Sequence, residues 1–169
     1  MGKMVAVMND ILRDLLDHNL WANRIVLEYS SGLLSEVLET TDSAAYGSIR
    51  STMQHLLTGE SLYAGMFIGR LQPWDLPDAA GPSIDEMLTW TDDLRAAWET
   101  VLASTFNAGS ILVLRREGRP DRSHRAGFLI TQALNHGNVH REQICHIITT
   151  LGLEPPDISG WRWESTRQP

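Results

Sequence analysis

Two histidines four positions apart, His136 and His140, mark the part of the sequence with the clearest chemical potential. Side chains at positions i and i+4 of a helix are neighbours, about 5–6 Å apart at Cβ. Two imidazole nitrogens so placed can reach one metal ion at about 2.0–2.1 Å. Because the spacing alone recurs by chance, the direction in which the pair points has to decide whether it is a candidate metal site.

The pair faces the predicted core. On a helical wheel, both histidines fall within or beside the apolar stripe of their segment. That stripe consists of Leu129, Ala133, Ile144, Ile147 and Leu151. Two imidazoles in a helix core are costly unless their nitrogens have partners. A shared metal ion would satisfy both rings, and this orientation therefore strengthens the metal hypothesis.

His55 is the candidate third ligand. It lies at the margin of the apolar stripe of another helical segment, so it can reach the same interior from a different helix. Three histidines with the remaining positions open would form a site able to bind a further molecule. Imidazole suits zinc, nickel, iron and copper, and we expect zinc or nickel. The alternative is that each histidine is a hydrogen-bonded core residue.

Other polar residues could support such a site. Gln143 projects about 20° from His136 on the wheel and could orient a ligand or hold a histidine. Arg141 could meet a carboxylate, or could lie at the surface or at a dimer interface. His18, on the flank of the first helix, is expected to support the site indirectly or to be structural. Cys145 lies about 180° from His136, so we do not expect it to bind the same ion.

Apolar periodicity and helix signals predict the elements that must position these residues. Ser83-Ile84-Asp85-Glu86 is a capping box that predicts a helix start, and Gly152 is a candidate residue just after a helix end. The predicted helices cover residues 4–29, 48–70, 83–104 and 125–151. Helices of this length favour an all-α four-helix bundle forming a single domain over residues 1–169.

The remaining segments carry weaker signals. Residues 33–46 are rich in turn formers and are expected to connect two helices. Residues 111–114, followed by Glu117 and Gly118, predict a short strand or hairpin before the last helix. The tail through Trp161 and Trp163 has no regular period. None of these segments alters the expectation of a bundle.

Composition restricts the function classes. The chain has 169 residues and a net charge of -7, which disfavours nucleic acid as a partner. Its single cysteine excludes an intramolecular disulfide and suits a reducing cytoplasm. No apolar run has the length of a signal peptide core or of a membrane span. We therefore expect a cytoplasmic protein that acts on a small molecule.

Three motifs in order along the chain resemble the DinB/YfiT-like family of metal-dependent enzymes. They are Asn19-Leu20-Trp21-Ala22-Asn23, then Met53-Gln54-His55-Leu56, then His136 through His140-Arg141-Glu142-Gln143. The resemblance implies an up-down-down-up four-helix bundle, often a homodimer, with a divalent ion held by His55, His136 and His140. Where the family often has glycine after the arginine, this chain has Glu142, which is expected to point outward.

The resemblance leaves three functions open. Related enzymes include transferases and isomerases that use low-molecular-weight thiols such as bacillithiol, mycothiol or glutathione, and others are described as hydrolases. We expect a thiol-dependent S-transferase, because no protein nucleophile stands out and an ion can activate an incoming thiol. The alternatives are hydrolysis by a water that the ion activates, and a non-enzymatic protein that binds metal or a small molecule.

Overall fold

The computed structural model describes residues 2–72, 81–116 and 118–168, without the side chains of residues 2–9, Arg116 and Arg119. Within that part, the predicted mostly helical architecture is confirmed, and a two-stranded sheet accompanies it. The elements are α1 (Gly2–Ser31), α2 (Ser35–Leu38), α3 (Ile49–Ile68), α4 (Ile84–Ala103), β1 (Ile111–Arg116), β2 (Arg119–Arg125), α5 (Ala126–Thr150) and α6 (Gly160–Arg167).

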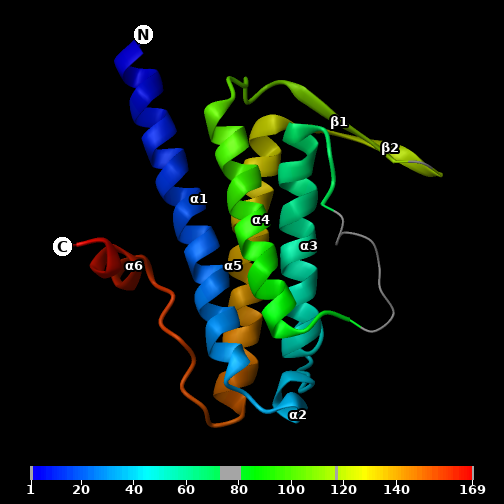
Figure 1. Ribbon diagram of the computed structural model, residues 1–169, viewed down its shortest axis with the longest axis vertical. Helices are drawn as coiled ribbons and strands as arrows, with labels where there is room; N and C mark the ends of the chain where they lie inside the picture. The colour runs from blue at the N-terminus through cyan, green and yellow to red at the C-terminus, as the bar shows by residue number, and fades with distance from the viewer. Residues whose placement is uncertain (1, 73–80, 117, 169) are drawn as a thin grey trace.

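The four long helices α1, α3, α4 and α5 lie side by side (Figure 1). In that view α1 and α5 run downward, whereas α3 and α4 run upward. Helix α3 packs against both α4 and α5, and α1 also packs against both. The two helices that carry His55 and the His136/His140 pair are therefore direct neighbours.

Apolar side chains from all four long helices fill the space between them. Leu20, Leu56, Leu94 and Ile144 belong to one cluster of buried side chains. Four of the five predicted apolar positions of α5 are buried, but Leu151 is exposed, because it caps the helix end. The apolar stripes thus turn the helices so that residues beside them face the interior.

The predicted helix signals act as expected. The Ser83 hydroxyl accepts a hydrogen bond from the Glu86 amide, and the Glu86 carboxylate accepts one from the Ser83 amide, which completes the capping box. Ser48 caps α3 by accepting a hydrogen bond from the Ser51 amide. Gly152 follows α5 with φ of +74°, the left-handed conformation in which glycine is favoured.

Two short helices were missing from the prediction. The connection 33–46 contains α2, whose single turn is too short to show an apolar period. The tail was expected to be irregular, and this is wrong, because α6 forms there with Ser159 as its N-cap. Every residue of α6 remains at least partly exposed, so the segment has no buried apolar stripe from which a helix could be predicted. It is held by the Arg167–Asp14 ion pair and by Trp163 against His18.

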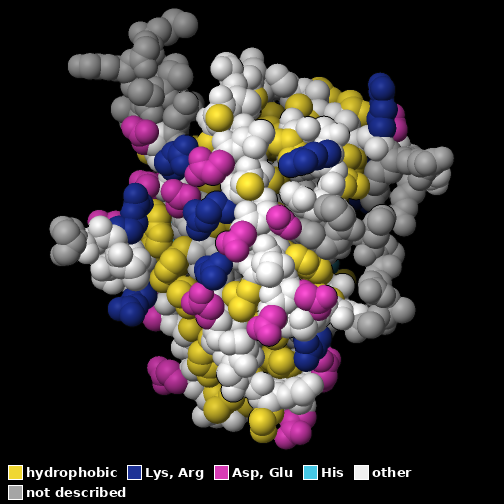
Figure 2. Space-filling view, in the orientation of Figure 1, with side chains coloured by type: hydrophobic (Ala, Val, Ile, Leu, Met, Phe, Trp, Pro, Cys, Tyr) yellow, Lys and Arg dark blue, Asp and Glu magenta, His cyan; other side chains and the backbone are white. Residues whose placement is uncertain are grey.

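The predicted extended segment is one strand of a longer antiparallel hairpin, β1–β2, which projects from the end of the helices (Figure 1). Leu114 of β1 packs with Met66 and Leu129, which ties the hairpin to α3 and α5. Figure 2 shows acidic and basic side chains interspersed on the face in view. Within the described ranges, no helix combines the length and apolar character needed to cross a bilayer.

Candidate metal site

The structure brings His55 of α3 together with His136 and His140 of α5. One ligand nitrogen from each ring lies within 4.8 Å of the others. We call these three residues the histidine cluster. His140 is buried, and the other two are partly buried. Among the residues that the structure describes, no cysteine, aspartate or glutamate joins this group.

The spacing of two cluster members fits a shared ion. Nε2 of His136 lies 3.2 Å from Nε2 of His55. Two nitrogens bound to one tetrahedral ion at 2.0–2.1 Å lie about 3.3 Å apart. Without an ion, these two atoms can share one proton at most, and Nδ1 of His136 is buried with no hydrogen-bond partner. A cation would use both facing lone pairs, so the donor set fits a metal that prefers imidazole.

Gln143 determines which nitrogen of His140 is available. Its amide nitrogen donates to the Ala44 carbonyl at 3.3 Å, so its Oε1 is the end that accepts from the Tyr46 amide, also at 3.3 Å. The same oxygen lies 2.7 Å from Nδ1 of His140. An oxygen cannot donate, so Nδ1 carries the proton and Nε2 of His140 keeps a lone pair for an ion.

Two tyrosines and a glycine shape the surroundings of the cluster. The Tyr46 ring stacks on His55 with a centroid separation of 3.9 Å and an interplanar angle of 11°. Tyr63 meets His136 edge to face at 5.6 Å. A methyl group on Gly59 would lie 2.6 Å from Cε1 of His136. Helix α3 can therefore approach the ring only because residue 59 has no side chain.

The electrostatic environment keeps two of the rings neutral. Burial, with smaller contributions from His140 and His55, lowers the pKa of His136 to about 4. Burial first, and His140 second, also lowers the pKa of His55. At neutral pH both imidazoles therefore present lone pairs rather than N–H⁺ groups. The neutral form is the one that binds metal.

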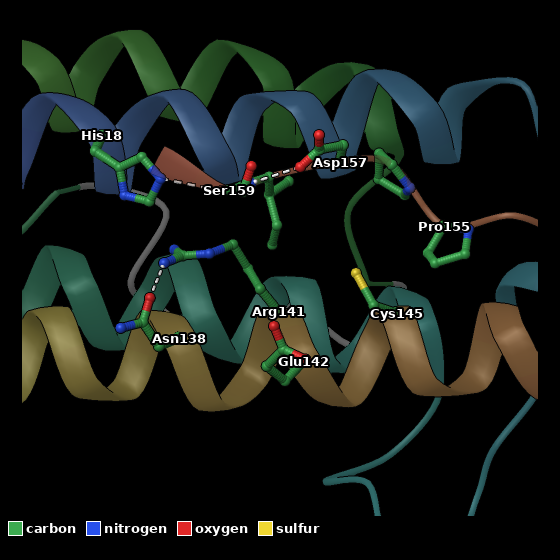
Figure 3. A pocket seen from close by; sticks show the side chains of 10 residues that line it. His18, Asn138, Arg141, Glu142, Cys145, Pro155, Asp157 and Ser159 are labelled. Atoms are coloured by element: carbon green, nitrogen blue, oxygen red, sulfur yellow. Dashed lines mark hydrogen bonds between the residues drawn. The ribbon is translucent and has the colours of Figure 1, made fainter. Parts of the chain in front are cut away.

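His18 and Cys145 lie elsewhere, beside a cavity of about 350 Å³ between α1, α5 and residues 155–159 (Figure 3). Nε2 of His18 contacts the Ile158 carbonyl at 3.0 Å, and its ring packs on Trp21 and Trp163. Burial raises the pKa of the Cys145 thiol to about 11. In keeping with the predicted orientation of Cys145, the thiol does not join the histidine cluster.

Arg141 is buried, with 1% of its surface exposed, so the expectation that it could lie at the surface or at a dimer interface is wrong for this chain. Its guanidinium donates to Asn19, Asn23 and Asn138. Burial lowers its pKa to about 10, which leaves it charged at neutral pH. Sequence reasoning could not show that this long side chain turns toward Asn19 and Asn23 of α1.

Sequence reasoning missed the positions that shape the site from outside the histidine pattern. Tyr46 lies in a connection with no period, so nothing indicated that it would stack on a histidine. The signal at Gly59 was present but unused, since a glycine in the middle of a helix is unfavourable unless something must come close to it. Glu60, one residue further on, is buried and accepts three hydrogen bonds from two other helices, which no local pattern predicts.

These observations define a mostly helical protein in which three histidines from two neighbouring helices could hold a metal ion. The chain belongs to the DinB family, whose model matches residues 8–168. No curated protein matches the sequence. The match to the family model confirms the resemblance that the three sequence motifs indicate.

Proposed function

We propose that this protein is a metal-dependent enzyme that transfers a group to the sulfur of a low-molecular-weight thiol. His55, His136 and His140 would hold one divalent ion, zinc or nickel. The observation that carries the proposal is a cluster of three imidazoles, two of them kept neutral by burial, with no fourth protein ligand among the described residues. A structural zinc site is normally closed by four protein ligands, whereas a catalytic site keeps a position open.

The surroundings favour a thiol cosubstrate over hydrolysis. Activation of water commonly uses a nearby carboxylate base, and no carboxylate of the described residues belongs to the cluster. Glu60 is occupied by three hydrogen bonds in the interior, and Glu142 is exposed. The Cys145 thiol lies in another cavity with a raised pKa, so it is not the nucleophile. A thiol substrate would bring the nucleophile that the chain lacks.

In the proposed reaction, a thiol RSH attacks an electrophile R′X. A sulfur–carbon bond forms, X leaves with the pair of the broken bond, and the thiol proton passes to solvent. A bound divalent ion supplies Lewis acidity that lowers the pKa of the thiol. Gln143 holds His140 in the Nδ1–H tautomer, and burial keeps His136 unprotonated. Tyr46 and Tyr63 flank the rings and limit the directions from which substrates can approach.

The proposal includes the finer features that family membership favours. The four long helices would form an up-down-down-up bundle, in agreement with their directions in Figure 1. The protein would act in the cytoplasm as a homodimer on a small electrophile, without nucleic acid or membrane partners. The net charge of -7 supports the exclusion of nucleic acid.

The test is thiol-dependent turnover. Protein loaded with zinc or nickel is mixed with 1-chloro-2,4-dinitrobenzene and with bacillithiol, mycothiol or glutathione in turn. Thioether formation above the uncatalysed rate, absent from the His140→Ala variant, supports the proposal. Turnover of an activated ester without any thiol, with no thioether formed, would instead favour the hydrolase.

A further inference from the structure

We propose that a second buried polar cluster, the Glu60–Arg141 network, positions the metal ligands by fixing α3 against α5. The network consists of Asn19, Asn23, Glu60, Trp98 and Arg141, which come from all four long helices. The inference rests on the proposed metal binding by the histidine cluster. It assigns Glu60 and Arg141 as positioning residues, since neither belongs to that cluster.

Every member of the network is at most 1% exposed. Oε1 of Glu60 accepts from Nδ2 of Asn19 at 2.9 Å and from Nε1 of Trp98 at 2.8 Å. Oε2 of Glu60 accepts from Nδ2 of Asn23 at 2.7 Å. A buried carboxylate and a buried guanidinium are thereby provided with partners away from water, which such groups require.

The two asparagines connect the charges and have one allowed orientation. Each uses Nδ2 to donate to Glu60 of α3 and Oδ1 to accept from Nη1 of Arg141 of α5. Flipping either amide would point an NH₂ group at the guanidinium and an oxygen at the carboxylate. The network therefore specifies a single arrangement of α1, α3 and α5.

That arrangement determines where the histidines lie. Glu60 follows His55 by five residues on α3, and Arg141 directly follows His140 on α5. Sliding one helix by one residue would move a ligand about 1.5 Å, whereas metal–ligand distances are specified to about 0.2 Å. A shift that broke the network would therefore also spoil the metal site.

Gly137 shows that the network and the ligands fit each other closely. A methyl group there would collide with Oδ1 of Asn19 and lie 2.8 Å from Nη1 of Arg141. The residue after ligand His136 thus leaves room for the network, just as Gly59 of α3, the residue before Glu60, leaves room for His136. The two clusters are fitted to each other at adjacent positions of both helices.

The chain offers a swap that tests positioning. Glu60→Gln places an NH₂ group against Nδ2 of Asn23, so a donor meets a donor. Adding Asn23→Asp gives every donor in the network an acceptor again. The new carboxylate at position 23 accepts from both the new amide at position 60 and Arg141. Oε1 of residue 60 meanwhile keeps its bonds from Asn19 and Trp98. The two substitutions together keep the net charge and move the negative charge from position 60 to position 23.

The experiment measures Co²⁺ binding to the full chain, with visible d–d absorption as the report of coordination geometry. We expect E60Q to weaken Co²⁺ binding at least about tenfold and to change the spectrum, and E60Q/N23D to recover both. Leu94→Ala, a core substitution in α4 outside both clusters, is the control for lost stability. It should keep the parent spectrum and affinity.

Trp98→Phe covers the case in which E60Q does not fold, since it removes one donor and keeps an aromatic ring. We expect it to weaken Co²⁺ binding about threefold or more, because Glu60 loses one of the hydrogen bonds that hold α3 in place. Parent affinity and spectrum in every folded network variant would overturn the inference and leave the metal site standing. The inference would also be overturned if L94A lost as much Co²⁺ affinity as E60Q does. A parent that binds no Co²⁺ would overturn both this inference and the proposed function.

Discussion

Two polar clusters of the described residues both join α3 to α5, and they differ in how completely their hydrogen bonds are satisfied. In the Glu60–Arg141 network, both charges have several partners and each bridging amide is used at both ends. In the histidine cluster, two Nε2 atoms face each other and Nδ1 of His136 has no partner. One cluster is complete as it stands, whereas the other presents lone pairs that an added cation would use.

The comparison shows how burial and function are divided in this fold. The complete network should carry stability and specify geometry, and the incomplete cluster should carry binding. Substitutions in the histidine cluster should therefore lower metal affinity with little loss of unfolding free energy, whereas substitutions in the network should lower both.

The largest effect on stability is expected for Glu60→Ala. This substitution leaves the Arg141 guanidinium buried without its carboxylate, and loss of one partner of a buried pair costs about 3–5 kcal/mol. Urea unfolding of metal-free protein measures the loss. His55→Ala, in which the lost ring is only partly buried, should cost markedly less under the same conditions. Equal losses for the two variants would contradict the division between the clusters.

The next effect concerns metal affinity. Gln143→Ala removes the acceptor that fixes the His140 tautomer, and loss of such an outer partner costs about 10–100-fold in affinity. Competition with a zinc chelator measures it. Glu142→Ala is the matched control, because the neighbouring residue is exposed and does not belong to the histidine cluster. Similar affinities for both variants would show that the amide does not hold the ligand.

Two glycine substitutions should affect different properties, because each crowds a different cluster. Gly137→Ala crowds Asn19 and Arg141, and overpacking costs about 1–3 kcal/mol of unfolding free energy. Gly59→Ala crowds the partly exposed His136 ring instead, while alanine favours the helix by up to about 1 kcal/mol. We expect Gly59→Ala to lose zinc affinity with little loss of stability. Thermal unfolding and zinc competition on both variants measure this contrast.

The last prediction is a pH dependence of the metal-free protein. The pKa of His136 is about 4 in the folded chain and near its ordinary value of 6.5 when unfolded. Between these values the unfolded chain binds the extra proton, so the free energy of unfolding falls as pH decreases from 6.5 toward 4. Urea unfolding across this range should show a shallower fall for His136→Phe.

The sequence predicts the two clusters unequally. The i,i+4 spacing and the apolar stripe were enough to select His136 and His140, because both signals are local to one helix. His55 required a second helix, yet its own stripe placed it correctly toward the interior. By contrast, the Glu60–Arg141 network joins four helices through side chains lying 37 to 122 residues apart, and no local period reports such contacts.

In the fold, too, features that depend on local contacts were predicted, and features that depend on distant contacts were missed. The capping box at Ser83 and the glycine after α5 predicted helix ends, because those interactions are formed within a few residues. Helix α6 was missed because its contacts, Trp163 on His18 and Arg167 on Asp14, are made with α1. Tyr46 was missed for the same reason, since its backbone is held by Gln143.

The central claim is that the histidine cluster binds one divalent ion, and metal stoichiometry tests it most directly. Untagged protein purified without chelator is analysed for transition metals, beside His55→Ala and the exposed-histidine control His146→Ala. The account predicts about one equivalent in the parent and in His146→Ala, and almost none in His55→Ala, with helical content retained in all three. A parent that carries no metal and takes up neither Zn²⁺ nor Ni²⁺ on titration would contradict it.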